Sequence, residues 1–141
     1  MRACTCRLAQ AVRQLTTLLA TLERSIADHP PSTDSQRYGN LSFRPWSAAA
    51  LKALPQLVDA ILSETHKAFL PHLVPLLTET SPFGNATRLD FGTGHEAAFF
   101  LFLYALRRIG VLTAADDLDV GLVVFPACVP SDGCHTLRRS D

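Results

Sequence analysis

The sequence has no excess of charge of either sign, because its 13 basic and 13 acidic side chains give a formal net charge of zero. Proteins that bind the phosphate backbone of a nucleic acid usually have more basic than acidic residues, so we expect no nucleic-acid partner. A small anion remains a candidate ligand, because it requires only local positive charge.

The chain also lacks an apolar run of the ~20 residues that a membrane-spanning helix needs. Its apolar run at residues 97–106 is half that length and begins beside His95 and Glu96, so we expect no membrane partner. The N-terminus has basic residues and no acidic residue before Glu23, a pattern that a transit peptide would share. A secretory signal fits less well, because threonines interrupt residues 15–22 and no clean cleavage region follows, and an ordinary amphipathic helix explains this segment better than either targeting signal.

Cysteines are few and confined to the two terminal segments. Cys4 and Cys6 are too close together for an ordinary disulfide. Cys128, Cys134 and His135 could join them around a metal ion, but the spacing fits no common zinc pattern. We therefore expect no metal site, and reduced thiols in a protein of the cytoplasm or also the nucleus.

Helical periodicity is the main structural signal in the 141 residues, of which 48% are apolar. Apolar side chains recur at spacings of three and four, and no strand alternation recurs, which predicts one all-α domain. The predicted helices cover residues 8–27, 45–62, 66–80 and 93–108. Residues 116–125 could be helix or strand, because residues 120–125 are short and β-branched, and we favour a helix from the N-cap before them and from the family resemblance described below.

Particular residues refine these helices. Pro45 suits the first position of the second helix, and Pro55 predicts a kink or a break inside it. Phe69 is expected to point inward from the third helix. The fourth helix is apolar almost all round in its middle, which predicts burial on most sides, and Gly110 suits the position after its end. Thr113 offers a second N-cap.

Polar residues that could bind a ligand or transfer a proton are most concentrated at residues 83–96, around the predicted start of the fourth helix. Thr93 followed by Glu96 fits a capping box, which would leave backbone N–H groups and partial positive charge at the helix start. Gly92 and Gly94 would permit positive φ or close approach of a ligand. Such a helix start is a favourable place for a phosphate or carboxylate.

The guanidinium of Arg88 could donate two charge-assisted hydrogen bonds to an anion at this site. The alternative is a glycine-rich turn that only redirects the chain, since the loop lacks the Lys-Ser/Thr of a phosphate-binding loop and follows no strand. His95 and Glu96 are candidate catalytic residues, although we favour a structural histidine and a helix cap. Asp90 is a third candidate, for which an ion pair with Arg88 is favoured over a metal ligand.

Several segments carry a resemblance to a known family. Asn85-Ala-Thr-Arg88, Asp90-Phe-Gly-Thr-Gly-His-Glu-Ala-Ala-Phe99 and Ile109-Gly-Val-Leu112 closely resemble the signature of the phosphotyrosyl phosphatase activator family, the activators of protein phosphatase 2A. Gln36-Arg-Tyr-Gly-Asn40 and Phe43-Arg-Pro-Trp46 are similar to two further segments of that family. Order and spacing agree over about residues 8–125.

The resemblance implies an all-α helical domain at residues 1–125, an incomplete version of the phosphatase 2A activator fold. Residues 126–141 are then a divergent tail that we expect to be poorly ordered. It also implies an ATP-dependent activator with peptidyl-prolyl cis-trans isomerase activity, in which Arg88, Thr93 and Gly94 match positions that contact ATP. The family uses Mg²⁺ as well, but its acidic Mg²⁺ segment has no counterpart here.

The implied partners are the catalytic and scaffold subunits of phosphatase 2A and a proline-containing peptide. Isomerisation needs a surface that binds the twisted X–Pro bond better than its planar forms, and this leaves little trace in a sequence. Tyr38, Phe43 and Trp46 would suit a proline-binding groove, with core packing as the alternative. A non-catalytic module that binds the phosphatase, or a generic nucleotide-binding helical domain, are the other hypotheses.

Overall fold

The computed structural model describes residues 9–32, 39–80, 82–89 and 92–128, and in these parts the regular elements are all helical. The α-helices are α1 (Gln10–Arg24), α2 (Phe43–Asp59), α3 (Leu70–Thr78), α4 (Thr93–Arg108), α5 (Asp117–Asp119) and α6 (Phe125–Cys128). Short 3-10 helices cover Ser25–Asp28, Glu64–Phe69 and Ala114–Asp116, and a π-helix covers Val120–Val124. The predicted all-α class is confirmed.

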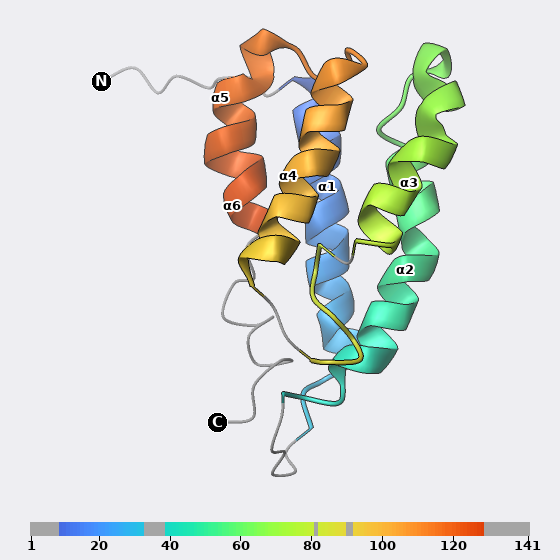
Figure 1. The fold of residues 1–141 in the computed structure, drawn as a ribbon, viewed down its shortest axis with the longest axis vertical. Helices are drawn as coiled ribbons and strands as arrows, with labels where there is room; N and C mark the ends of the chain where they lie inside the picture. The colour runs from blue at the N-terminus through green and yellow to red at the C-terminus, as the bar shows by residue number, and fades with distance from the viewer. Residues whose placement is uncertain (1–8, 33–38, 81, 90–91, 129–141) are drawn as a thin grey trace.

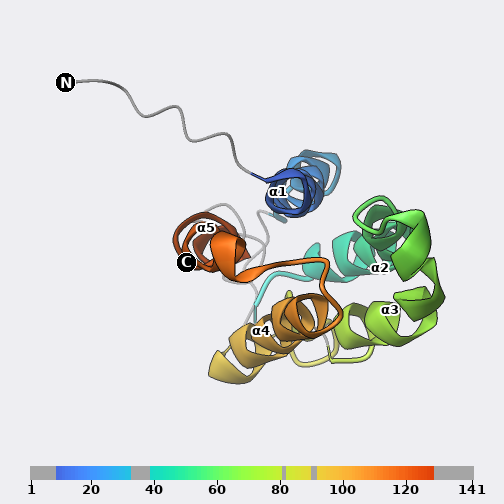
Figure 2. The same cartoon turned by 90° about the horizontal axis from the view of Figure 1, so that it is seen from above.

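The helices stand around a shared interior (Figures 1 and 2). Helix α1 contacts α2, α2 contacts α3, and α3 contacts α4, while α6 contacts both α4 and α1 and so completes the ring. None of the helices in the described residues is long and apolar enough to cross a membrane.

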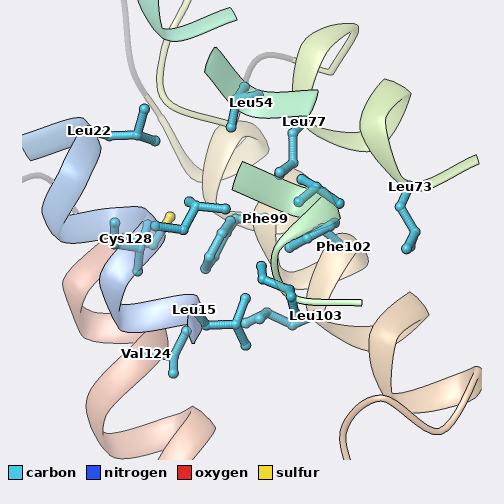
Figure 3. Packing of buried hydrophobic residues seen from close by; sticks show 14 of the residues in the cluster. Leu15, Leu22, Leu54, Leu73, Leu77, Phe99, Phe102, Leu103, Val124 and Cys128 are labelled. Atoms are coloured by element: carbon cyan, nitrogen blue, oxygen red, sulfur yellow. The ribbon is translucent and has the colours of Figure 1, made fainter. Parts of the chain in front are cut away.

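The core fills the middle of this ring, and α1, α2, α3 and α4 contribute large side chains to it (Figure 3). Leu15 of α1, Leu54 of α2, Leu77 of α3 and Phe99 of α4 are all fully buried. The rings of Phe99 and Phe102 lie 6.1 Å apart, centroid to centroid, in a tilted arrangement that suits aromatic pairs. The apolar stripes seen in the sequence are therefore the helix faces that pack against one another in this core.

Helix α2 starts two residues earlier than its sequence predicts. The carbonyl of Asn40 accepts from the N–H of Phe43 at 3.1 Å, and its Oδ1 accepts from the N–H of Ser42 at 2.9 Å. Pro45 is therefore the third helical residue, where a missing N–H still costs no intrahelical bond. The helix is also continuous through Pro55, so the expected break is absent.

The third predicted helix divides into a 3-10 segment and α3. Phe69 ends the 3-10 segment and is 40% exposed, so its predicted inward orientation is wrong. A 3-10 helix has three residues per turn, which shifts Phe69 out of phase with the buried Leu73 and Leu77 of α3.

Helix α4 has the predicted bounds, but it is not buried on most sides. Its inner face carries the buried residues Phe99, Phe102, Leu103 and Leu106. Its outer face carries Phe100, Leu101 and Tyr104, which are 60%, 47% and 51% exposed. The apolar character all round the helix therefore includes an outer face that is only partly covered, where the ring of Phe100 meets that of Phe125 edge to face at 6.3 Å between centroids.

The C-terminus of α4 confirms the predicted role of Gly110, which has φ +85°. The N–H of Val111 donates to the carbonyl of Leu106 at 3.0 Å, and the N–H of Gly110 donates to Arg107 at 3.4 Å. This pair of hydrogen bonds is the Schellman motif, in which the left-handed residue is usually glycine.

The last described segment is helical, as predicted, and starts at the predicted N-cap. Thr113 and Asp116 form a capping box in which one Asp116 oxygen accepts from the N–H and the hydroxyl of Thr113, both at 2.8 Å. Helix α6 continues to Cys128, which is 5% exposed, so residues 126–128 of the expected tail are part of the helical fold. Residues 129–141 lie outside the described residues.

Candidate functional site

The loop that carries Arg88 passes beside the N-terminal end of α2 (Figure 1). Arg44, on the first turn of α2, donates from Nε to the carbonyl of Ala86 at 3.0 Å. Its Nη2 donates to the carbonyl of Thr87 at 3.4 Å. One guanidinium therefore joins two segments that are 42 and 43 residues apart in the chain.

The turn at residues 85–89 also has its own internal hydrogen bonds. Oδ1 of Asn85 accepts from the N–H groups of Thr87 at 2.9 Å and Arg88 at 2.8 Å, which is the turn that an asparagine side chain favours. Leu89 donates to the carbonyl of Asn85 at 2.7 Å and adopts φ +55° while buried. A non-glycine residue in this region is strained and persists only where its surroundings hold it. The backbone on both sides of the exposed Arg88 is thus well defined.

The start of α4 differs from the predicted capping box. Gly92 is the N-cap, with φ −161°, and Thr93 is the first helical residue. Glu96 is therefore the fourth helical residue, one position too late for a capping box, so that prediction is wrong. Gly92 has no side chain to accept from the first-turn N–H groups, and Thr93 and Gly94 are both exposed. No side chain therefore caps the N-terminal N–H groups of α4.

The glycines have a different role from the one expected. The extended φ of Gly92 is open to any residue, and Gly94 is helical. A Cβ built on either would meet no atom within 4 Å. The fold therefore does not require glycine at these two positions, whereas Gly84 does have a positive φ, of +114°. The open space at Gly94 leaves the first turn of α4 accessible to a ligand.

The remaining candidates can be placed in part. His95 and Glu96 are half-buried in the first turn of α4, and the N–H of His95 donates to the carbonyl of Gly92 at 2.9 Å. Asp90 lies outside the described residues, and so does its expected ion pair with Arg88. In the part of the chain that the structure describes, no three His, Cys, Asp or Glu side chains gather as a metal site would require.

The aromatic residues near the start of α2 belong to the core. Phe43 and Trp46 are 0% and 3% exposed, and their ring centroids are 5.3 Å apart. The Trp46 indole N–H donates to Ser25 Oγ at 2.9 Å. Core packing, the alternative to a proline-binding groove, is thus the observed arrangement for both residues, and Tyr38 lies outside the described residues.

The structure also contains a groove that the sequence did not predict as a site. It has a volume of about 900 Å³ and lies between the C-terminal half of α4 and the helical stretch 117–125. Phe100 and Tyr104 line one side, and Val120 and Phe125 line the other. The only sequence signal for it was the apolar outer face of α4, which periodicity alone could not distinguish from burial.

Comparison with known proteins identifies the family. A family profile described as "Phosphotyrosyl phosphate activator (PTPA) protein" matches residues 2–129. This chain belongs to the phosphotyrosyl phosphate activator family. The match includes both segments that Arg44 joins, and it extends through α6, beyond the boundary predicted at residue 125.

Curated members of the family show the same relationship at the sequence level. A serine/threonine-protein phosphatase 2A activator from Drosophila melanogaster is 36% identical over 117 residues, which is 83% of this chain and 29% of that protein. A phosphatase 2A activator 1 from Saccharomyces cerevisiae is 35% identical over 112 residues, or 79% of this chain and 28% of that protein. The chain thus spans less than a third of the length of these two relatives.

A solved structure of the family shares the fold. The crystal structure of the PP2A phosphatase activator Ypa1 PTPA1 superimposes with a TM-score of 0.74 at 34% sequence identity. The similarity covers 83% of this chain and 36% of that one. The helical ring described above is therefore part of the fold of a phosphatase activator.

Proposed function

We propose that this chain binds ATP through the surface formed by Arg88, Thr93 and Gly94, as a module of a protein phosphatase 2A activator. The observation that supports this is a turn with a defined backbone that presents an exposed arginine shortly before an exposed helix start without a capping side chain. The family relationship supplies the candidate ligand and the candidate partner.

The physical chemistry of these groups suits a polyphosphate. The N–H groups at the start of a helix, with the positive end of its dipole, attract anions. An arginine adds a planar fork that matches two phosphate oxygens. Cationic and N–H donors do not suit a Mg²⁺ ion, which prefers oxygen ligands, so we assign these residues to the phosphates and no residue here to magnesium.

The isomerase activity and the phosphatase partners also stay proposals for this chain. We assign no residue to isomerisation, because Asp90 lies outside the described residues and the half-buried His95 and Glu96 belong to the first turn of α4. The proposed partners are the catalytic and scaffold subunits of phosphatase 2A. Binding to the phosphatase without activation is the alternative, and the exposed apolar face of α4 favours it. A pull-down combined with a phosphatase activity assay separates the two.

The test of the ATP site is a titration by calorimetry or NMR. We expect the wild-type chain to bind ATP with a Kd in the high micromolar to millimolar range, about −4 to −6 kcal/mol, because the surface is open. Arg88→Ala should weaken binding by about 1–3 kcal/mol, the usual size of a lost charge-assisted contact. Lys52→Ala, which removes one charge from an exposed position of α2, is the matched control.

Gly94→Val is a second variant, and its effect on binding should not be confused with an effect on folding. Its side chain would extend into open space, so the fold should persist while the approach of a phosphate is blocked. Thr93→Ala should also leave the stability unchanged, since Thr93 is not the helix cap. Equal affinities of wild type and Arg88→Ala would refute the role of Arg88, and absence of wild-type binding would refute the site.

A further inference from the structure

We propose that Arg44 is the residue that positions the Arg88 turn for the anion, through its two hydrogen bonds to the backbone of that turn. This inference rests on the proposed ATP site. Arg44 itself is assigned no contact with the ligand.

The position of Arg44 is set by its neighbours in the sequence. Phe43 and Trp46, on either side of it, are buried in the core, and this fixes the first turn of α2. Asn40, which is 1% exposed, hydrogen-bonds the N–H of Ser42 just before the helix. The arginine therefore extends from a rigid base.

The acceptors of Arg44 are two consecutive carbonyls, those of Ala86 and Thr87, which immediately precede Arg88. Two donors in the fixed plane of one guanidinium restrain both the place and the orientation of these peptide groups. A lysine has a single ammonium on a flexible stem and cannot reproduce that geometry, although it keeps the charge.

The turn requires such a restraint from outside. The side chain of Asn85 accepts a hydrogen bond from the N–H of Arg88 inside the turn. Leu89, however, has a left-handed backbone conformation that an isolated leucine would rarely adopt. The burial of Leu89 anchors one end of the turn in the core, and Arg44 holds the other end against α2. Loss of the Arg44 hydrogen bonds would let the backbone before Arg88 relax, so that its fork would no longer be oriented.

The test compares Arg44→Lys and Arg44→Ala with Lys52→Ala, the charge control on the same helix. The first readout is the ¹⁵N order parameters of Thr87 and Arg88, measured without any ligand. The second is the affinity for ATP at one fixed ionic strength, with the thermal melt of each variant recorded. We expect both Arg44 variants to lower the order parameters and to weaken ATP binding about three- to tenfold, because the broken hydrogen bonds are charge-assisted but exposed. Lys52→Ala should match the wild type in both readouts.

Two results would overturn the inference. Unchanged order parameters in Arg44→Ala would show that Arg44 does not hold the turn. Wild-type affinity in Arg44→Lys, with a loss in Arg44→Ala, would show that Arg44 acts through its charge alone. Failure of the wild-type chain to bind ATP would instead refute the proposed site, and the order parameters would then still decide whether Arg44 holds the turn.

Discussion

The exposed apolar residues of the last helical stretch lead to a prediction about self-association. Leu118 and Leu122 are 70% and 69% exposed and lie one helical turn apart. We expect the wild-type chain to associate or aggregate through such surfaces, because large apolar side chains gain free energy when they leave water. The double substitution of Leu118→Gln and Leu122→Gln should suppress this association.

The size of the effect follows from the exposed fractions. Complete burial of a leucine side chain is worth about 1.5–3 kcal/mol, so the exposed 70% of each contributes about 1–2 kcal/mol. Two residues give about 2–4 kcal/mol for each contact that buries both, or roughly a 30- to 1,000-fold fall in the association constant. Stability should change by no more than about 0.5 kcal/mol, since the replaced side chains are mostly in water.

Sedimentation velocity over a concentration series measures the association, and circular dichroism measures the thermal melt. Lys52→Gln, an exposed change on a different helix, should leave both unaltered. A wild-type chain that sediments as a single monomer at all concentrations, with a sharp cooperative melt, would refute the reasoning. An association constant that the double variant leaves unchanged would assign the association to another surface.

Three further predictions concern stability. Gly110→Ala should cost about 1–2 kcal/mol in urea unfolding, purely through the left-handed φ, because a Cβ there meets no atom within 4 Å; an unchanged midpoint would contradict this. Asp116→Ala should cost about 1–2 kcal/mol by opening the capping box with Thr113, and a thermal melt equal to that of the wild type would argue against the box. Truncation after Phe125 should lower the melting temperature because it removes the buried Cys128, whereas truncation after Cys128 should not; equal melting temperatures would disprove the difference.

The sequence predicted the helices well where two signals agreed. The bounds of α4 were correct because turn residues precede it, an apolar period fills it and a glycine follows it. At Pro55 the sequence predicted a kink or a break, and the break is absent because the buried Leu54 and Val58 on either side hold a helix that local propensity disfavours. The prediction of an inward orientation failed at Phe69 because the change from 3-10 to α geometry leaves no mark in the spacing.

The surroundings of the candidate residues could be predicted only in part. Arg88, Thr93 and Gly94 are on the exposed surface, as an anion site requires, but the helix starts one residue earlier than a threonine cap would place it. The side chain of Arg44 could not be connected to this site from the sequence, because its acceptors are backbone carbonyls 42 and 43 residues away. A backbone acceptor can belong to any residue type, so sequence pattern gives no information about it.

The two surfaces of α4 place different demands on the chain. The turn before its N-terminus is shaped by hydrogen bonds that Arg44 donates and that Asn85 accepts, all within the chain itself. The apolar residues on its outer face, among them Phe100 and Tyr104, are more than half exposed, and these exposed parts gain free energy when another surface covers them. An anion site of the first kind can keep its geometry in the chain alone, whereas a docking face of the second kind is satisfied only in a complex. The proposed nucleotide binding and the proposed partner binding should therefore be separable by mutation, since they would depend on different surfaces of the helix and on different forces.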